Sequence, residues 1–212
     1  MNKVDIVVNE AKKLLKENPF DVGHDLSHHT MVWRLAKRIT KNIDEKIDMD
    51  ALKTACLWHD VVVTKLPTKD VLLKTKMTDD SLEYLVVLLK KYKFSKEFIN
   101  KVVIAKKYHH FDEKPRSVEG KILWDADKLG VLGLNRWQRF IQAEKNGKIP
   151  KSFVSYYAST FKEKYLKTMR NRLHFKYSKI LHDEMILRLI KSKEGRATAK
   201  RFSWDLKSAL PK

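Results

Sequence analysis

The chain is poor in the residues that build disulfide-linked and turn-rich proteins. Its 212 residues include one cysteine, six glycines and five prolines. The single Cys56 cannot form an intrachain disulfide, which favours a reducing compartment. Few glycines and prolines disfavour a β-sandwich or barrel, because these folds need many tight turns. No apolar run approaches the roughly 20 residues that span a bilayer, and charges interrupt the short apolar stretch at the N-terminus, which disfavours a secretory signal. We therefore expect a soluble, cytoplasmic protein with no membrane partner.

Positive charge is in large excess. Lysine and arginine number 45 against 26 aspartates and glutamates, a formal net charge of +19. A field of this sign concentrates anions such as nucleotides, nucleic acids and acidic membrane surfaces. The lysines are spread along the chain rather than collected in one tract, so the same excess also fits a protein that gains only solubility. Charge alone does not identify the partner.

Apolar residues recur at helical spacing nearly everywhere. The pattern predicts an all-α, single-domain helical bundle of roughly eight helices over residues 1–212. The metal-binding core is expected at about 20–140, with C-terminal helices in 151–212 packing on it. The oligomeric state does not follow from the sequence.

Several local features are also predicted from the pattern. Ser27 and Ser95 precede helical stretches and are expected to cap them. Residues 65–69 are expected to form a loop, and residues 156–173 a single helix. The aromatic residues of the C-terminal half are more typical of core than of a base-stacking platform; they include Trp137, Phe140, Tyr156, Tyr157 and Phe161.

The most informative feature is the pair His59-Asp60. His28 lies 31 residues before His59, and the acidic pair Asp125 and Asp127 lies downstream. Two imidazoles and two carboxylates from distant helices can close around one divalent ion. Two aspartates would neutralise its charge, and the mixed nitrogen and oxygen set suits manganese, iron, cobalt, nickel or zinc better than calcium, with magnesium possible. Water on such an ion becomes a nucleophile near neutral pH.

Two ligand positions have neighbours that compete for the same role. His29 can take the place of His28 if the helix begins one residue later. Asp125 competes with Asp127, although an aspartate at the start of a helix is often only a cap.

Three stretches of the sequence resemble the signature of the HD-domain metal-dependent phosphohydrolases, in particular their small single-domain branch. The resemblance covers about residues 20–140. The stretches are His24-Asp-Leu-Ser-His28, Leu57-Trp-His59-Asp60-Val and Glu119-Gly-Lys-Ile-Leu-Trp-Asp125-Ala-Asp127-Lys128-Leu.

The resemblance implies a helical fold and a metal bound at positions matching His28, His59, Asp60 and Asp127. In that family the downstream metal ligand looks like an aspartate that is followed by a basic residue and a leucine. This places the fourth ligand at Asp127 and leaves Asp125 as a supporting residue.

Further residues are candidates for roles beside the ligands. His109 and His110 can supply a ligand for a second metal or a general acid for the leaving group, or they can form a surface pair at the negative end of a helix. Lys128 is a candidate phosphate contact. Asp60 is expected to be catalytic as well as metal-binding. His24 is expected to orient a metal ligand without binding the metal itself.

The function that these residues favour is a metal-dependent phosphohydrolase acting on a nucleotide or another small phosphorylated metabolite. One alternative is a basic nucleic-acid-binding or regulatory module with a structural metal site, supported by Arg196, Lys200 and Arg201 in the basic tail 193–212. Another is a hydrolase of cyclic nucleotides or other phosphodiesters, which needs the same metal chemistry.

Overall fold

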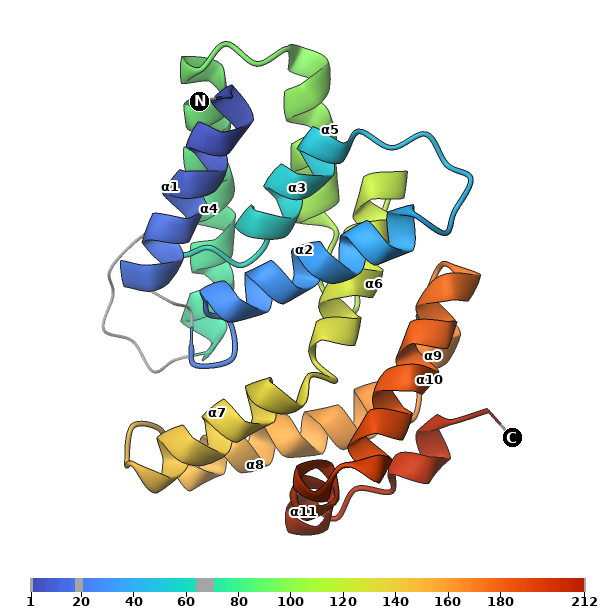
Figure 1. Cartoon of the computed structure of the whole chain (residues 1–212). Helices are drawn as coiled ribbons and strands as arrows, with labels where there is room; N and C mark the ends of the chain where they lie inside the picture. Colours follow the sequence, from blue (N-terminus) through green and yellow to red (C-terminus); the bar gives the residue numbers. More distant parts are fainter. Residues whose placement is uncertain (1, 18–20, 64–70, 212) are drawn as a thin grey trace. The chain divides into compact units, whose positions relative to one another are not determined.

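The computed structural model describes residues 2–17, 21–63 and 71–211, with only the backbone of 71–80. Throughout this described part the secondary structure is helical, without a strand, which confirms the all-α prediction (Figure 1). Eleven α-helices are found there, slightly more than the expected eight. The predicted loop at 65–69 falls outside the described residues.

The chain divides into two compact units, Met1–Ala126 and Asp127–Lys212, and the boundary falls inside helix α6. The expectation of a single domain over the whole length stays a prediction. The helices that begin in the first unit are α1 (Lys3–Glu17), α2 (Leu26–Thr40), α3 (Met49–Trp58), α4 (Val71–Lys91), α5 (Lys96–Lys107) and α6 (Val118–Gly130).

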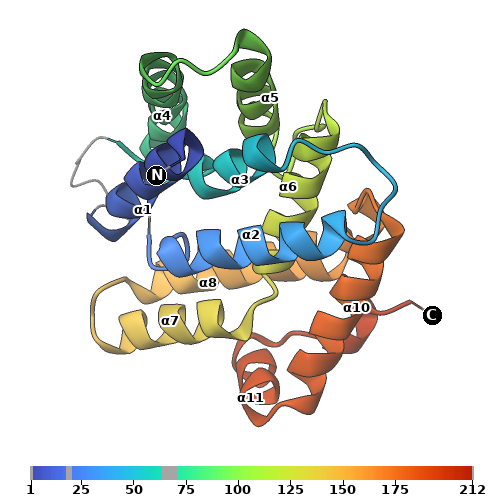
Figure 2. The same cartoon turned by 45° about the horizontal axis from the view of Figure 1, so that its top comes forward.

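Helix α3 forms the centre of the first unit. It packs against α1, α2 and α5 (Figure 2). Its residues Leu52, Ala55 and Trp58 are fully buried, so the helix has almost no polar face. The indole N–H of Trp58 donates to the backbone oxygen of Val7 at 3.0 Å, which fixes the end of α3 against α1. The next two residues are His59 and Asp60, so this packing positions them.

The beginning of α3 is tied to the beginning of α6. Asp48 caps α3, because its carboxylate accepts from the backbone N–H of Ala51 at 3.0 Å. The backbone N–H of Asp48 in turn donates to the buried Glu119 carboxylate at 3.1 Å. Glu119 therefore braces two helices at once and satisfies a helix-end donor that would otherwise lack a partner.

The caps were predicted correctly at one helix and wrongly at another. Ser95 accepts from the backbone N–H of Phe98 at 3.2 Å and caps α5 as expected. At α2 the cap is Asp25, whose carboxylate accepts from the backbone N–H of His28 at 3.1 Å. Ser27 lies in the first turn and donates to Asp25 at 2.7 Å. An ionised carboxylate is the stronger acceptor at the positive end of a helix.

The second unit contains the additional helices. The single helix expected over 156–173 is interrupted by a π-helical stretch, Phe161–Leu166, and Gly133 begins a separate helix after α6. The helices of this unit are α7 (Leu134–Lys145), α8 (Lys151–Thr160), α9 (Met169–Arg172), α10 (Lys176–Lys191) and α11 (Lys193–Phe202), followed by a 3-10 turn at Leu206–Ala209.

An aromatic cluster forms the core of the second unit. Trp137, Phe140 and Phe161 are buried, as the sequence predicts, and Trp204 joins them. The rings of Trp137 and Trp204 lie edge to face with centroids 4.6 Å apart. Tyr156 was assigned to the core wrongly, since 62% of it is exposed. None of the described helices is both long and apolar enough to cross a membrane.

We expect Trp137→Ala to lower the free energy of unfolding by about 3 to 5 kcal/mol, because it empties the centre of the aromatic cluster. The control Tyr156→Ala removes an aromatic ring from the surface and should cost no more than about 0.5 kcal/mol. Urea denaturation followed by circular dichroism measures both values. Equal losses in the two variants would contradict the assignment of the core.

Candidate metal centre

Two buried histidines face each other through their Nε2 atoms. His28 lies in the first turn of α2, and His59 is the residue that ends α3. Both side chains are buried, and the two Nε2 atoms are 3.3 Å apart. Two nitrogen ligands on a tetrahedral ion have nearly this separation when each bond is about 2.0 to 2.1 Å long.

A backbone carbonyl fixes the tautomer of His59. Its Nδ1 lies 2.8 Å from the carbonyl oxygen of Cys56. A carbonyl can only accept, so Nδ1 carries the hydrogen and the neutral ring has a lone pair on Nε2. This lone pair is directed to the side on which His28 lies. Ligating histidines are commonly oriented in this way.

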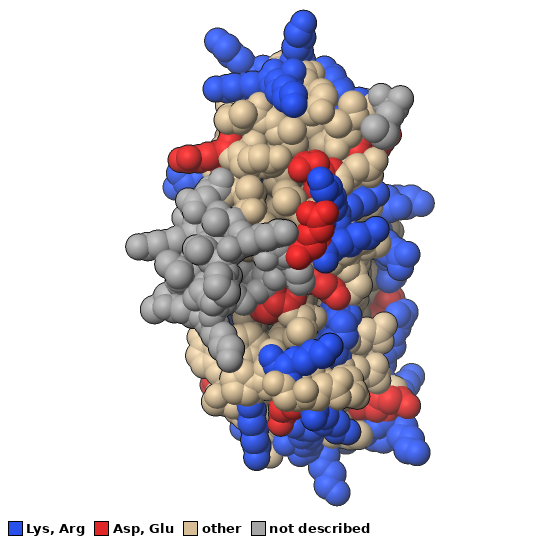
Figure 3. Space-filling model, turned by 90° about the vertical axis from the view of Figure 1, so that its left-hand side faces the viewer, with Lys and Arg blue, Asp and Glu red and all other residues tan. Residues whose placement is uncertain are grey.

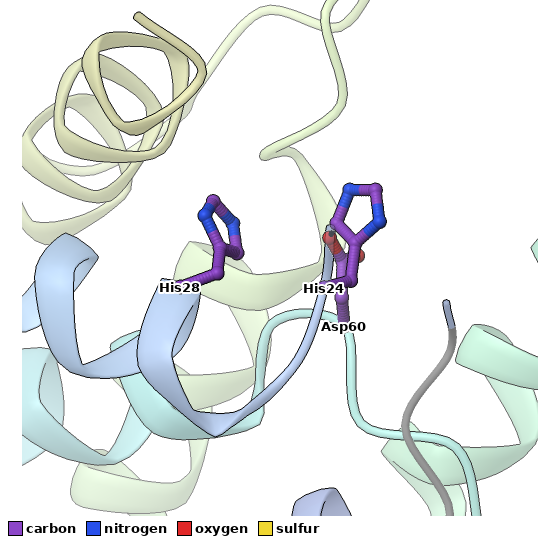
Figure 4. Close-up of side chains that lie close together, drawn as sticks. All are labelled: His24, His28 and Asp60. Carbon is purple, nitrogen blue, oxygen red and sulfur yellow. Dashed lines mark ion pairs between the residues drawn. The ribbon is translucent and has the colours of Figure 1, made fainter. Parts of the chain in front are cut away.

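Asp60 brings a carboxylate into the same group. Its Oδ2 lies 3.5 Å from Nε2 of His59 and 3.8 Å from Nε2 of His24. Figure 4 shows the rings of His24 and His28 standing side by side, with Asp60 next to His24. His24 precedes α2, His28 lies on it, and Asp60 follows α3, so two helix ends meet at this point.

His109 approaches the other oxygen of Asp60. Its Nδ1 donates to the carbonyl of Lys106, which leaves the lone pair on Nε2, 3.1 Å from Oδ1 of Asp60. Burial lowers the pKa of His109 to about 4 in spite of the nearby carboxylate. Burial alone would raise the pKa of Asp60, but the surrounding imidazoles, His59 foremost and then His109, hold it well below its usual range. At neutral pH two acceptors therefore face each other, an arrangement that a cation between them would stabilise.

Asp21 orients His24, and the sequence pattern did not single it out. Its carboxylate accepts from Nδ1 of His24 at 2.9 Å and from the backbone N–H of Gly23 at 2.6 Å. The lone pair of His24 is thus turned to Nε2, the atom nearest Asp60. The spacing Asp-x-Gly-His, typical of an aspartate-stabilised turn, is the signal that could have identified it.

Within the first unit these side chains form two groups whose potential ligand atoms all lie within 4.8 Å of one another. One contains His24, His28 and Asp60, and the other contains Asp60, His109 and His110. Asp60 belongs to both, so the groups are continuous. Imidazole nitrogens with carboxylate oxygen and no thiolate suit a divalent transition metal, and the residues therefore fit such an ion.

His29, the alternative to His28, lies behind the ligand atoms. It is fully buried, and among the described residues neither ring nitrogen has a hydrogen-bond partner. Its ring lies over that of His59 at a centroid distance of 4.2 Å. Burial, followed by the neighbouring imidazoles, lowers its pKa well below 6.5. It belongs to neither group, so the geometry of the first unit favours His28.

The remaining predicted residues lie on α6. Asp125 is fully buried in the first unit and joins neither group. Asp127 and Lys128 open the second unit, and both are buried. The ammonium of Lys128 donates to Oδ2 of Asp127 at 2.5 Å. Lys128 is therefore a partner of the predicted ligand.

A helical protein that gathers histidines and an aspartate from separate elements around a common point has the architecture of a metal-binding helical domain. The HD domain model matches residues 25–131, and the chain belongs to this family. HD domains bind divalent metals, and their superfamily includes metal-dependent phosphohydrolases.

Comparison with individual proteins agrees with this assignment. The uncharacterized protein YpgQ of Bacillus subtilis is 32% identical over 134 residues, which span 59% of this chain and 60% of the length of YpgQ. The crystal structure of YpgQ in complex with ADP has a TM-score of 0.63 at 24% identity and covers 94% of both chains. A Lactobacillus plantarum structure has a TM-score of 0.66 at 17% identity, covering 95% of this chain and 97% of that one. These two structural similarities show that the chain has the same fold as those proteins.

The lowered pKa of His109 predicts how the metal-free protein responds to acid. As pH falls from 6.5 to 4, the unfolded chain binds a proton at this residue and the folded chain does not. The unfolded state thus binds more protons in this window, and stability falls with pH, by about 3 kcal/mol from this residue. His109→Gln should remove that part of the loss in chelator-treated protein, measured by urea denaturation at pH 7 and pH 4. An unchanged pH dependence would show that His109 is not held neutral.

Proposed function

We propose that the chain is a metal-dependent phosphohydrolase that acts on a nucleotide through an activated water molecule. The observation that carries the proposal is the convergence of imidazole nitrogens and carboxylate oxygens in the first unit. Nε2 of His28 faces Nε2 of His59 at 3.3 Å, and the acceptors of His109 and Asp60 meet at 3.1 Å. Nitrogen and oxygen atoms gathered this closely can bind one divalent cation.

The residues that would hold the ion are His28, His59, Asp60 and Asp127. Support for Asp127 comes from the periodicity of α6. The indole N–H of Trp124 donates to the backbone oxygen of His110 at 3.0 Å, which turns the Trp124 face of α6 to the histidine pair. Asp127 follows Trp124 by three residues and therefore shares this face. Asp125 follows by one residue and points about 100° away.

Manganese, iron, cobalt, nickel and zinc fit a site of two imidazoles and two carboxylates better than magnesium, which prefers oxygen ligands. When bound, such an ion supplies Lewis acidity, which lowers the pKa of water and offsets the charge of a phosphate. The protein supplies the orientation: carbonyls of Cys56 and Lys106 and the carboxylate of Asp21 set three imidazoles.

Proton transfer is assigned to the pair His109 and His110. His109 is buried and neutral, and its Nε2 lies 3.1 Å from Oδ1 of Asp60, so the two atoms would share a cation. His110 is half-buried, and its ring lies over that of His109 at a centroid distance of 4.2 Å. Its greater exposure suits a group that exchanges protons with solvent and donates one to the leaving group. Lys128, paired with Asp127, would contribute positive charge beside the phosphate.

Three observations support a nucleotide as the substrate. The HD superfamily includes phosphohydrolases. A relative with the same fold was crystallised with ADP. The net charge of +19 raises the local concentration of anions.

The direct test is a hydrolysis screen of nucleotides and phosphate esters, with manganese, cobalt, nickel and magnesium added separately. We expect turnover of a nucleotide with a transition metal. Asp60→Ala should lose most bound metal and at least about a thousandfold in turnover, because it removes charge and geometry together. Metal analysis and circular dichroism of the variant show whether it is folded and empty. Full metal occupancy in Asp60→Ala would refute the assignment, as would turnover in the presence of chelator.

A pair of isosteric variants separates the two aspartates of α6. Asp127→Asn should weaken metal binding by about 10- to 100-fold or more, because it removes a charged ligand. Asp125→Asn keeps the volume of a buried side chain and should leave metal affinity within about threefold. Titration with manganese, followed by its paramagnetic resonance signal, gives both affinities. The opposite order would place the fourth ligand at Asp125.

A further inference from the structure

The connection between α4 and α5 carries a dense group of lysines. Residues 90–96 read Lys-Lys-Tyr-Lys-Phe-Ser-Lys, and all four lysines are exposed. We call this segment, together with Lys3, the basic tip. Figure 3 shows Lys and Arg side chains gathered at the upper end of the displayed face, the end at which the connection lies in Figure 1. The basic tip belongs entirely to the first unit.

The positive charge of the basic tip is not compensated locally. Glu97, the next acidic residue, forms its ion pair with Lys101 at 2.9 Å. Within the described part of the chain, none of the lysines at 90, 91, 93 and 96 makes an ion pair with a carboxylate. The segment therefore keeps a high local charge, and binding of a polyanion would release the counterions around it.

One residue of the basic tip, Lys93, has an unfavourable backbone conformation. Lys93 has φ of 54°, a left-handed conformation in which glycine is preferred at the end of a helix. The backbone N–H of Phe94 donates to the oxygen of Leu89 at 3.1 Å, which closes the helix end. A lysine is less favourable than a glycine in this conformation, because its Cβ approaches the backbone. A positively charged lysine therefore occupies a position at which a glycine would give the more stable backbone.

Contacts among its own residues hold the tip in shape. Lys3 donates to the backbone oxygen of Lys93 at 3.2 Å and lies 4.6 Å from the centre of the Phe94 ring. The ring of Phe94 also stacks on that of Phe98, with the two centroids 4.5 Å apart. Phe94 therefore anchors the basic tip to the start of α5. Tyr92 is half-buried and lies between two exposed lysines, so part of its ring remains accessible.

The basic tail, the sequence candidate for nucleic-acid binding, is engaged differently. Arg196 donates to the backbone oxygens of Ile190 and Lys191 at 3.3 and 2.6 Å. Arg201 pairs with Glu144 at 2.7 Å. Both arginines are therefore engaged in contacts within the second unit.

We propose that the basic tip binds single-stranded nucleic acid, with its lysines on the phosphates and Tyr92 stacked on a base. Alternating cations and an accessible aromatic ring are what sequence-independent single-strand binding requires. The proposal is independent of the metal centre.

The test compares two variants that lose the same charge. One carries Lys90→Gln, Lys91→Gln, Lys93→Gln and Lys96→Gln. The control carries Lys145→Gln, Lys148→Gln, Lys151→Gln and Lys162→Gln, at exposed lysines of the second unit. Binding of a fluorescent single-stranded oligonucleotide of mixed sequence is measured by anisotropy over a range of salt concentrations. Circular dichroism checks that each variant is folded.

We expect the tip variant to lose at least about tenfold in affinity at low salt. The slope of log affinity against log salt should fall by about 3, since each phosphate contact on a single strand contributes about 0.7. The control variant should lose less than about threefold in affinity for the oligonucleotide. If the tip variant does not fold, Lys90→Gln with Lys96→Gln should reduce the slope by about half as much.

A second comparison tests stacking. Tyr92→Ala should lower the affinity by about fivefold or more with an unchanged salt slope, and Tyr92→Phe should bind like the wild type. Equal losses in the tip variant and the control would overturn the proposal, as would wild-type affinity in Tyr92→Ala. So would binding to phosphatidylserine vesicles without binding to the oligonucleotide.

Discussion

The structure depends on how backbone carbonyls hold histidine rings. Because a carbonyl accepts and never donates, the oxygens of Cys56 and Lys106 require a hydrogen on Nδ1 of His59 and His109. Each ring is left with a lone pair on Nε2, and both of these atoms lie close to Asp60, at 3.5 Å for His59 and 3.1 Å for His109. Buried acceptors without a donor between them are unfavourable. In the proposed metal centre, a divalent cation satisfies several of these acceptors together.

The rest of the first unit holds the converging side chains in fixed relative positions. Helix α3 is enclosed by α1, α2 and α5, and its last residues are anchored by the bond from Trp58 to Val7. Its first turn is fixed to α6 through Glu119. Both ends of the helix that delivers His59 and Asp60 are thus held by specific hydrogen bonds. A site that must position ligands to within about 0.5 Å needs such support from rigid elements.

The sequence singled out candidate metal ligands but not the groups that orient them. His59 and Asp60 could be identified because they are adjacent and follow a buried helix, and the helical class followed from periodicity. The carbonyl of Cys56 could not be identified, because every residue has one and only the fold shows which is near a ring. The helix count differed for local reasons, since a π-helical stretch at Phe161–Leu166 interrupts one expected helix and Gly133 begins a separate one. Asp127 stays a prediction, as it begins the second unit.

The proposed site binds one divalent transition metal among these converging atoms. Crystals of the protein grown with manganese, with diffraction recorded on both sides of the manganese absorption edge, test this directly. We expect an anomalous peak about 2.0 to 2.3 Å from Nε2 of His28, Nε2 of His59 and a carboxylate oxygen of Asp60. A peak bound elsewhere, or crystals whose histidines are bridged only by water at saturating manganese, would contradict it.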